Sequence, residues 1–179
     1  MLRAGVGLST ERDSARAAAE AAGIALRSAD LARADVLFVF ATTAHGPGFT
    51  RVTRTAAEVC GTAQVVGCSA AGVLVGEDEV EGGPGVAVLA LAGDFAVRRF
   101  FVPLVRGGAE RVADDIRAAV GPGEGDEPLL FLFGDTYHLE PEPLFQALKD
   151  DNPNLVTVSR GYREPVCFHT DVNIARGHR

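Results

Sequence analysis

The stretch Asp35-Val36-Leu37-Phe38-Val39-Phe40-Ala41 decides the fold class. It is a continuous apolar run, without the alternation of a strand that has one face in water. It therefore predicts a strand buried on both faces, as in sheets that helices cover. A second run of this kind, Leu129-Leu130-Phe131-Leu132-Phe133, lies further along the chain.

Outside these two runs, the pattern alternates between strands and helices. Alternation of this kind predicts an α/β fold, with a mixed, mostly parallel sheet flanked by helices and an antiparallel β-hairpin insertion. The hairpin is expected from two apolar runs joined by Gly93-Asp94, a link that suits a tight turn. No internal repeat is evident. Further strands are expected at about residues 3–8, 64–68, 86–92, 96–104 and 155–159, and helices at about 15–22, 50–60, 109–120 and 141–149.

The length of 179 residues suits one domain. The pattern predicts that this domain covers residues 3–160. Residues 161–179 carry no sustained apolar period and are expected to form an unpatterned tail.

Composition argues against several classes of protein. The net charge is −7 and no basic face is evident, so nucleic acid is not an expected partner. The longest strongly apolar run, Val86–Leu91, is far shorter than the ~20 residues that cross a membrane. Membrane insertion is therefore not expected.

Cysteine and lysine usage indicate the cellular setting. Three cysteines, Cys60, Cys68 and Cys167, form neither a disulfide framework nor a zinc pattern, which favours a reducing cytoplasm. The N-terminus lacks the apolar region of a secretory signal. Lys149 is the one lysine among 17 basic residues, a bias typical of GC-rich bacterial genomes.

Polar and small residues follow the predicted buried strands. In Val65-Val66-Gly67-Cys68-Ser69-Ala70-Ala71-Gly72, a strand leads directly into small residues whose N–H groups could bind an anion. Because ligands of open α/β sheets bind outside the carboxyl ends of the strands, the loops after the other strands should join this site. The predicted ligand-binding residues are Thr42, His45, Gly67, Cys68, Ser69, Gly72 and Asp135.

Each of these residues also has a plain structural interpretation. The small residues could serve only a tight strand-to-helix connection, and Cys68 could be an ordinary buried thiol. No two of His45, His138 and His169 have the i, i+4 spacing of a helical metal site, so neither a metal nor another cofactor is expected. The acidic segment Glu77–Glu81 lacks calcium-loop spacing and is interpreted as a solvated turn, with a cation site as the alternative.

Three segments together resemble the FIST N-terminal domain, named for F-box and intracellular signal transduction. They are Gly67-Cys68-Ser69-Ala70-Ala71-Gly72-Val73, the acidic Glu77–Glu81, and Gly85-Val86-Ala87-Val88-Leu89-Ala90-Leu91. The strand at Val36–Phe40 and its exit to His45 are also similar. The resemblance covers roughly residues 3–160, and beyond it the chain departs from the FIST C-terminal domain that usually follows.

The resemblance implies a sensory domain that binds a small ligand, with amino acids as candidates, in intracellular signalling. Its implied partners are that ligand and a FIST C-terminal or signalling domain, in trans or missing from this chain. Catalysis is not expected. Two alternatives stay open: a cysteine-dependent enzyme with Cys68 as nucleophile and His45 as base, and an interaction module that docks on a partner domain.

Overall fold

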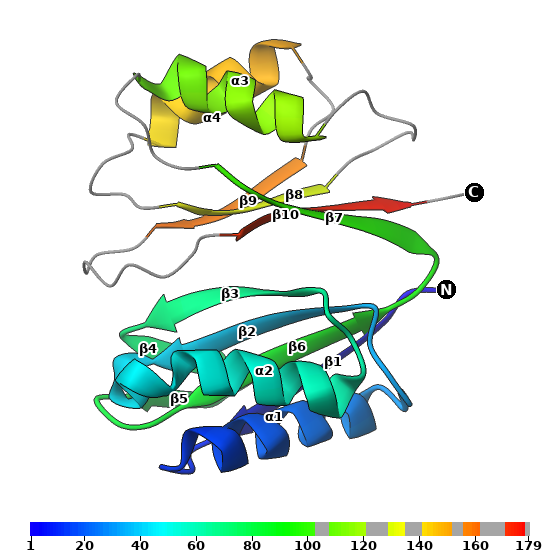
Figure 1. Cartoon of the computed structure of the whole chain (residues 1–179), viewed down its shortest axis with the longest axis vertical. Coiled ribbons are helices and arrows are strands. Elements are labelled where there is room, and N and C mark those ends of the chain that lie inside the picture. Colours follow the sequence, from blue (N-terminus) through cyan, green and yellow to red (C-terminus); the bar gives the residue numbers. More distant parts are fainter. Residues whose placement is uncertain (103–107, 121–128, 135–140, 152–155, 162–170, 178–179) are drawn as a thin grey trace. The chain divides into compact units, whose positions relative to one another are not determined.

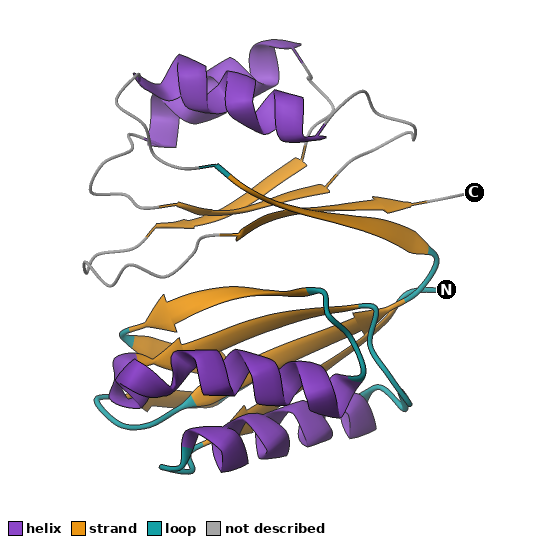
Figure 2. Cartoon of the chain, viewed as in Figure 1, coloured by secondary structure: helices purple, strands orange, loops and turns teal. Residues whose placement is uncertain are grey.

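The computed structural model describes residues 1–102, 108–120, 129–134, 141–151, 156–161 and 171–177. Backbone contacts divide the chain into two compact units, Met1–Gly93 and Asp94–Arg179. Each unit has a four-stranded sheet with two helices on one face (Figures 1 and 2).

The first unit is built on a mixed sheet of order β1-β6-β2-β3. Strand β6 is antiparallel to both β1 and β2, and β2 is parallel to β3. A small antiparallel hairpin of β4 and β5 follows β3. The elements are β1 (Arg3–Ser9), α1 (Ser14–Ser28), β2 (Val36–Thr42), a 3-10 segment η1 (Thr43–Gly48), α2 (Phe49–Cys60), β3 (Val65–Ala70), β4 (Gly72–Val75), β5 (Asp78–Glu81) and β6 (Val86–Ala92).

Small residues let α1 approach the sheet closely. A Cβ atom at Gly7 would lie 2.1 Å from the Ala21 carbonyl oxygen of α1, and one at Gly5 would lie 2.0 Å from that of Ala25. The facing side of the helix consists of alanines, which are fully buried. The alanine-rich run therefore reflects close packing as well as helix propensity, and the helix continues through Gly23, where the sequence predicted its end, to Ser28.

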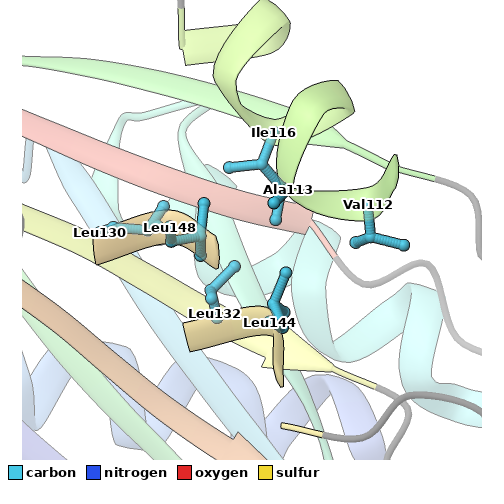
Figure 3. Packing of buried hydrophobic residues seen from close by; sticks show 7 residues of the cluster. All are labelled: Val112, Ala113, Ile116, Leu130, Leu132, Leu144 and Leu148. Atoms are coloured by element: carbon cyan, nitrogen blue, oxygen red, sulfur yellow. The ribbon is translucent and has the colours of Figure 1, made fainter. Parts of the chain in front are cut away.

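The second unit has a sheet of order β7-β10-β8-β9. Its helix-facing core consists of aliphatic side chains from α3, α4 and β8, which Figure 3 shows interdigitating: Val112, Ala113, Ile116, Leu130, Leu132, Leu144 and Leu148. The elements are β7 (Phe95–Phe101), α3 (Gly108–Val120), β8 (Leu129–Gly134), α4 (Pro141–Asp151), β9 (Val156–Gly161) and β10 (Asp171–Gly177).

The two units repeat one topology. In each, the first strand pairs with the last, the last with the second, and the second in parallel with the third. Leu37-Phe38-Val39-Phe40 of β2 corresponds to Leu130-Phe131-Leu132-Phe133 of β8, and a histidine stands five residues after each run, at His45 and His138. The expectation of no repeat was wrong, because the shared topology needs only apolar strands and leaves other positions free to diverge.

The predicted α/β class with a mixed sheet is confirmed, but two details differ. Antiparallel pairs outnumber parallel ones in both sheets. The antiparallel hairpin is β4–β5, whereas the predicted partners at residues 86–92 and 96–104 belong to different sheets. Strand β6 could not pair with β7, because β1 and β2 already occupy both its edges.

The division into units falls inside the predicted domain of residues 3–160. Within the predicted tail, residues 171–177 form β10, which lies between β7 and β8. Pairing on both sides explains how a stretch without an apolar period can be a strand. Its backbone forms hydrogen bonds with the backbones of both neighbouring strands. The boundary at residue 160 itself stays a prediction.

A substitution at Gly67 tests how closely the backbones of β2 and β3 approach each other. Its φ is +153°, and a Cβ there would lie 1.7 Å from the Val39 carbonyl oxygen. We expect Gly67→Ala to lower the free energy of unfolding by about 2 kcal/mol or more, since backbone must move. Gly83, where an added Cβ meets nothing within 4 Å, is the control: Gly83→Ala should stay within about 0.5 kcal/mol of wild type in urea unfolding. Equal effects of the two changes would contradict the close approach.

Candidate functional site

The carboxyl ends of three strands meet at one edge of the first unit's sheet. Because β6 is antiparallel to both β1 and β2, strands β1, β2 and β3 run in the same direction. The register places Ser9, Val86, Ala41 and Ser69 in one row across the sheet at this edge. Polar side chains are concentrated here: the four buried polar residues among those described are Ser9, Thr42, His45 and Ser69.

Thr42 ends β2 and anchors the segment that follows the hairpin. Its hydroxyl donates to the Gly83 carbonyl (2.7 Å) and accepts from the Gly85 N–H (2.9 Å). The Thr42 N–H also donates to the Gly85 carbonyl, at 2.8 Å. The side chain is 1% exposed, so its hydroxyl positions the neighbouring chain.

His45 lies in η1, immediately after β2, and is 3% exposed. Its Nδ1 is 3.1 Å from the Ser14 hydroxyl oxygen, at the first residue of α1. Its Nε2 is buried without a hydrogen-bond partner in the described part of the chain. Burial lowers the pKa of His45, although the Asp13 carboxylate acts in the opposite direction.

Gly67, Cys68 and Ser69 lie within β3, paired with Val39, Phe40 and Ala41. The expected nest of free N–H groups at a strand-to-helix turn is therefore not at these residues, because β3 continues to Ala70 and then leads into β4. Cys68 is half-buried, and Ser69 is 1% exposed.

Gly72 and Asp135 are the remaining predicted site residues. Gly72 begins β4, where an added Cβ would lie 3.0 Å from Glu81 Cγ across the hairpin. Asp135 falls outside the described residues. The structure thus brings Thr42, His45 and Ser69 to one edge of the sheet, as the sequence predicted, while the part each plays in ligand binding stays a prediction.

A pocket of about 380 Å³ opens at this edge, between the end of β1, helix α1 and strand β5. Leu8 and Val80 form its apolar part, and both pack on the small core beneath the hairpin. Its other lining residues are polar or acidic: Ser9, Thr10, Glu11, Glu20, Asp78 and Glu79. None of the lining residues in the described chain is basic, so the pocket is strongly negative.

Ser9 connects the sheet edge to the pocket wall. Its buried hydroxyl donates to Glu20 Oε2 at 2.5 Å and accepts from the Glu11 N–H at 3.3 Å. Ser9 and Glu20 were not among the residues predicted from the sequence, because their meeting depends on how α1 folds back along β1. The acidic segment Glu77–Glu81 was the sequence signal that could have indicated this pocket. The solvated turn expected there is a hairpin with exposed carboxylates, two of which line the pocket.

Neither a metal nor a membrane site is found in the described part of the chain. No group of three or more His, Cys, Asp or Glu side chains there could hold a metal ion. Among the same residues, no helix has both the length and the apolar character needed to cross a membrane.

The FIST N domain matches residues 35–158, which is more than half of the chain. The chain therefore belongs to the FIST N family, whose domains are sensory modules of signal transduction. The match begins at the strand run that decides the fold, which confirms the resemblance stated from the sequence. No curated protein sequence matches the chain.

Similar solved structures include a cyanuric acid hydrolase from A. caulinodans, with 11% identity and a TM-score of 0.43. That similarity covers 98% of this chain and 70% of the other. A second structure, also described as a cyanuric acid hydrolase, has 8% identity and a TM-score of 0.48 over 99% of this chain and 69% of the other. Similarity at this level says nothing about the chemistry of this chain.

The burial of His45 predicts how stability depends on pH. Because its pKa is lower in the folded chain than the ordinary value of 6.5, the folded state binds fewer protons here than the unfolded state. The contribution of the neutral His45 ring to the free energy of unfolding is complete above pH ~6.5. It is lost as the pH falls from there through the folded-state pKa.

Urea unfolding at a series of pH values measures how stability depends on pH. The range from about pH 8 to about pH 5 spans the ordinary histidine pKa of ~6.5. Subtracting the curve of His45→Gln, which cannot titrate, isolates the contribution of His45. We expect wild type to lose stability relative to the variant as pH falls. A difference that is flat, or that rises towards acid pH, would contradict the burial of a neutral ring.

Thr42 gives a second prediction. Thr42→Val keeps the side-chain shape but leaves the Gly85 N–H without its hydroxyl acceptor, and an unsatisfied buried group costs about 1–3 kcal/mol. We expect a loss of that size in urea unfolding. Thr42→Ser, which retains the hydroxyl, should preserve most of the stability; a valine variant as stable as the serine variant would show that these hydrogen bonds contribute little.

Proposed function

We propose that this chain is a non-catalytic sensory domain that binds a small amine, with amino acids as the first candidates. Membership of the FIST N family supports the sensory role. The observation that carries the ligand class is the acidic pocket at the carboxyl edge of β1. Its carboxylates would hold the ligand's ammonium group, since opposite charges attract strongly where water is partly excluded.

The pocket also limits how an amino acid would bind. With no basic side chain among the lining residues, the ligand's carboxylate would face the open mouth and its ammonium the carboxylates. The apolar pair Leu8 and Val80 would contact a short aliphatic side chain. Thr42, by holding Gly83 and Gly85, would keep β5 at the proper place for Asp78 and Glu79.

The absence of catalysis is part of this proposal. Because β3 leads into β4, no helix N-terminus follows Cys68 to stabilise a thiolate there. Cys68→Ala should change ligand affinity only modestly under this proposal. Abolition of a measurable turnover by the same change would instead favour the cysteine-dependent enzyme.

We further propose a setting for the domain. The odd number of cysteines and the lysine-poor composition support a bacterial cytoplasm. The family supports a partner that transmits the signal, either a FIST C-terminal domain or another signalling module. The acidic net charge of −7 supports the absence of a nucleic-acid partner.

Isothermal titration tests the ligand class. Glycine and N-acetylglycine share a carboxylate but differ in the ammonium group, so we expect amines across an amino-acid panel to bind better than their acetylated forms. Exposed ion pairs contribute ~0.2–1 kcal/mol each. The triple change Glu20→Gln, Asp78→Asn, Glu79→Gln should therefore weaken binding by roughly threefold to 150-fold, and added salt should weaken wild-type binding.

Glu58 is the matched control, an exposed carboxylate on α2 that does not line the pocket. Glu58→Gln should bind like wild type. If folded protein gives no heat with any amino acid or simple amine, or if acetylated ligands bind equally well, the proposed ligand class is wrong.

A further inference from the structure

Ser14 and His45 form a polar pair outside the lining of the acidic pocket. Ser14 is the first residue of α1 and is half-buried, and its Oγ lies 3.1 Å from His45 Nδ1. That separation is within the reach of a general base for the proton of a hydroxyl group. The ring of His45 is 3% exposed and its Nε2 has no hydrogen-bond partner among the described residues, so burial of this side chain costs free energy.

The surroundings of the ring suit a base. Burial keeps His45 neutral near pH 7, so that Nδ1 can accept a proton when the ring hydrogen is on Nε2. Asp13 is the charged group that acts on the ring, and its carboxylate would stabilise the imidazolium that forms. Asp13 is itself an N-cap, accepting from the Ala15 and Arg16 N–H groups, with Arg16 and Arg51 as nearby positive charges.

The position of Ser14 suits a nucleophile. The positive end of the α1 dipole lies at its backbone, where the Asp13 carboxylate accepts from the Ala15 and Arg16 N–H groups. Gly48 leaves room for the hydroxyl, since a Cβ there would lie 2.2 Å from Ser14 Oγ.

We propose that Ser14 is a reactive serine that accepts an acyl group from a small activated ester or thioester, with His45 as its base. Ser14 Oγ forms a bond to the carbonyl carbon, and its proton moves to His45 Nδ1. The bond from that carbon to the leaving oxygen or sulfur breaks, and the leaving group takes the proton from His45. The product is one acyl-serine and one free alcohol or thiol, so a sensory domain would be covalently marked without turnover.

Incubation of the full chain with p-nitrophenyl acetate, followed by peptide mass spectrometry, tests this proposal. We expect acetylation at Ser14 that is absent in Ser14→Ala and at least about 100-fold slower in His45→Gln, because a general base contributes ~10²–10⁴-fold. Ser28→Ala, which removes a hydroxyl at the other end of α1, should be acetylated at Ser14 like wild type. Circular dichroism of each variant shows whether it is folded.

A pH profile separates a base from a structural contact. The acetylation rate of Ser14 should follow deprotonation of a group with a pKa below 6.5, the ordinary histidine value, and this step should vanish in His45→Gln. Should His45→Gln destroy the fold, the wild-type pH profile alone decides. Acetylation confined to other residues, an equal rate in folded His45→Gln, or a rate that rises only with hydroxide would overturn the proposal.

Discussion

The first unit depends on the pairing of β6 with β1 on one side and β2 on the other. Because β6 is antiparallel to both, the strands on either side of it run in the same direction, and their carboxyl ends meet at one edge. This constraint brings Ser9, near the start of the chain, to the same edge of the sheet as Thr42 and Ser69, which come much later in the sequence. It also explains why the pocket lies between the β1 end and a hairpin nearly seventy residues further on.

The first unit also depends on the close approach of α1 to β1 and of β2 to β3. The glycines of β1 admit the alanine face of α1, and Gly67 admits the Val39 carbonyl between β2 and β3. Tight packing of this kind brings α1 near enough for Ser9 to reach Glu20 and for Ser14 to reach His45. The polar contacts at the sheet edge are thus consequences of small residues in the core.

The repeated topology gives equivalent places to positions that looked unrelated in the sequence. The runs that end at Phe40 and Phe133 stand at the same place in their units, as second strands paired with the last strand and, in parallel, with the third. The sequence retains this equivalence only where both sheets need a fully buried strand. Elsewhere the side chains differ. The first strand of one unit, β1, contains glycines, whereas the first strand of the other, β7, contains phenylalanines.

The sequence by itself determined the α/β class, the family, the sheet edge at which polar residues gather, and the helices and strands other than β4, β5 and β10. It could do so because apolar periodicity and the Gly67–Val73 motif are local patterns, whereas Gly23 did not end α1 as expected. Which strands pair was decided only by the tertiary structure. A Gly-Asp link is compatible with a hairpin, but β6 had both edges occupied, and β10 became a strand through its neighbours despite its pattern. The lining of the pocket and the Ser14–His45 pair were likewise decided in three dimensions, because each joins residues from distant segments and depends on how α1 folds back over β1.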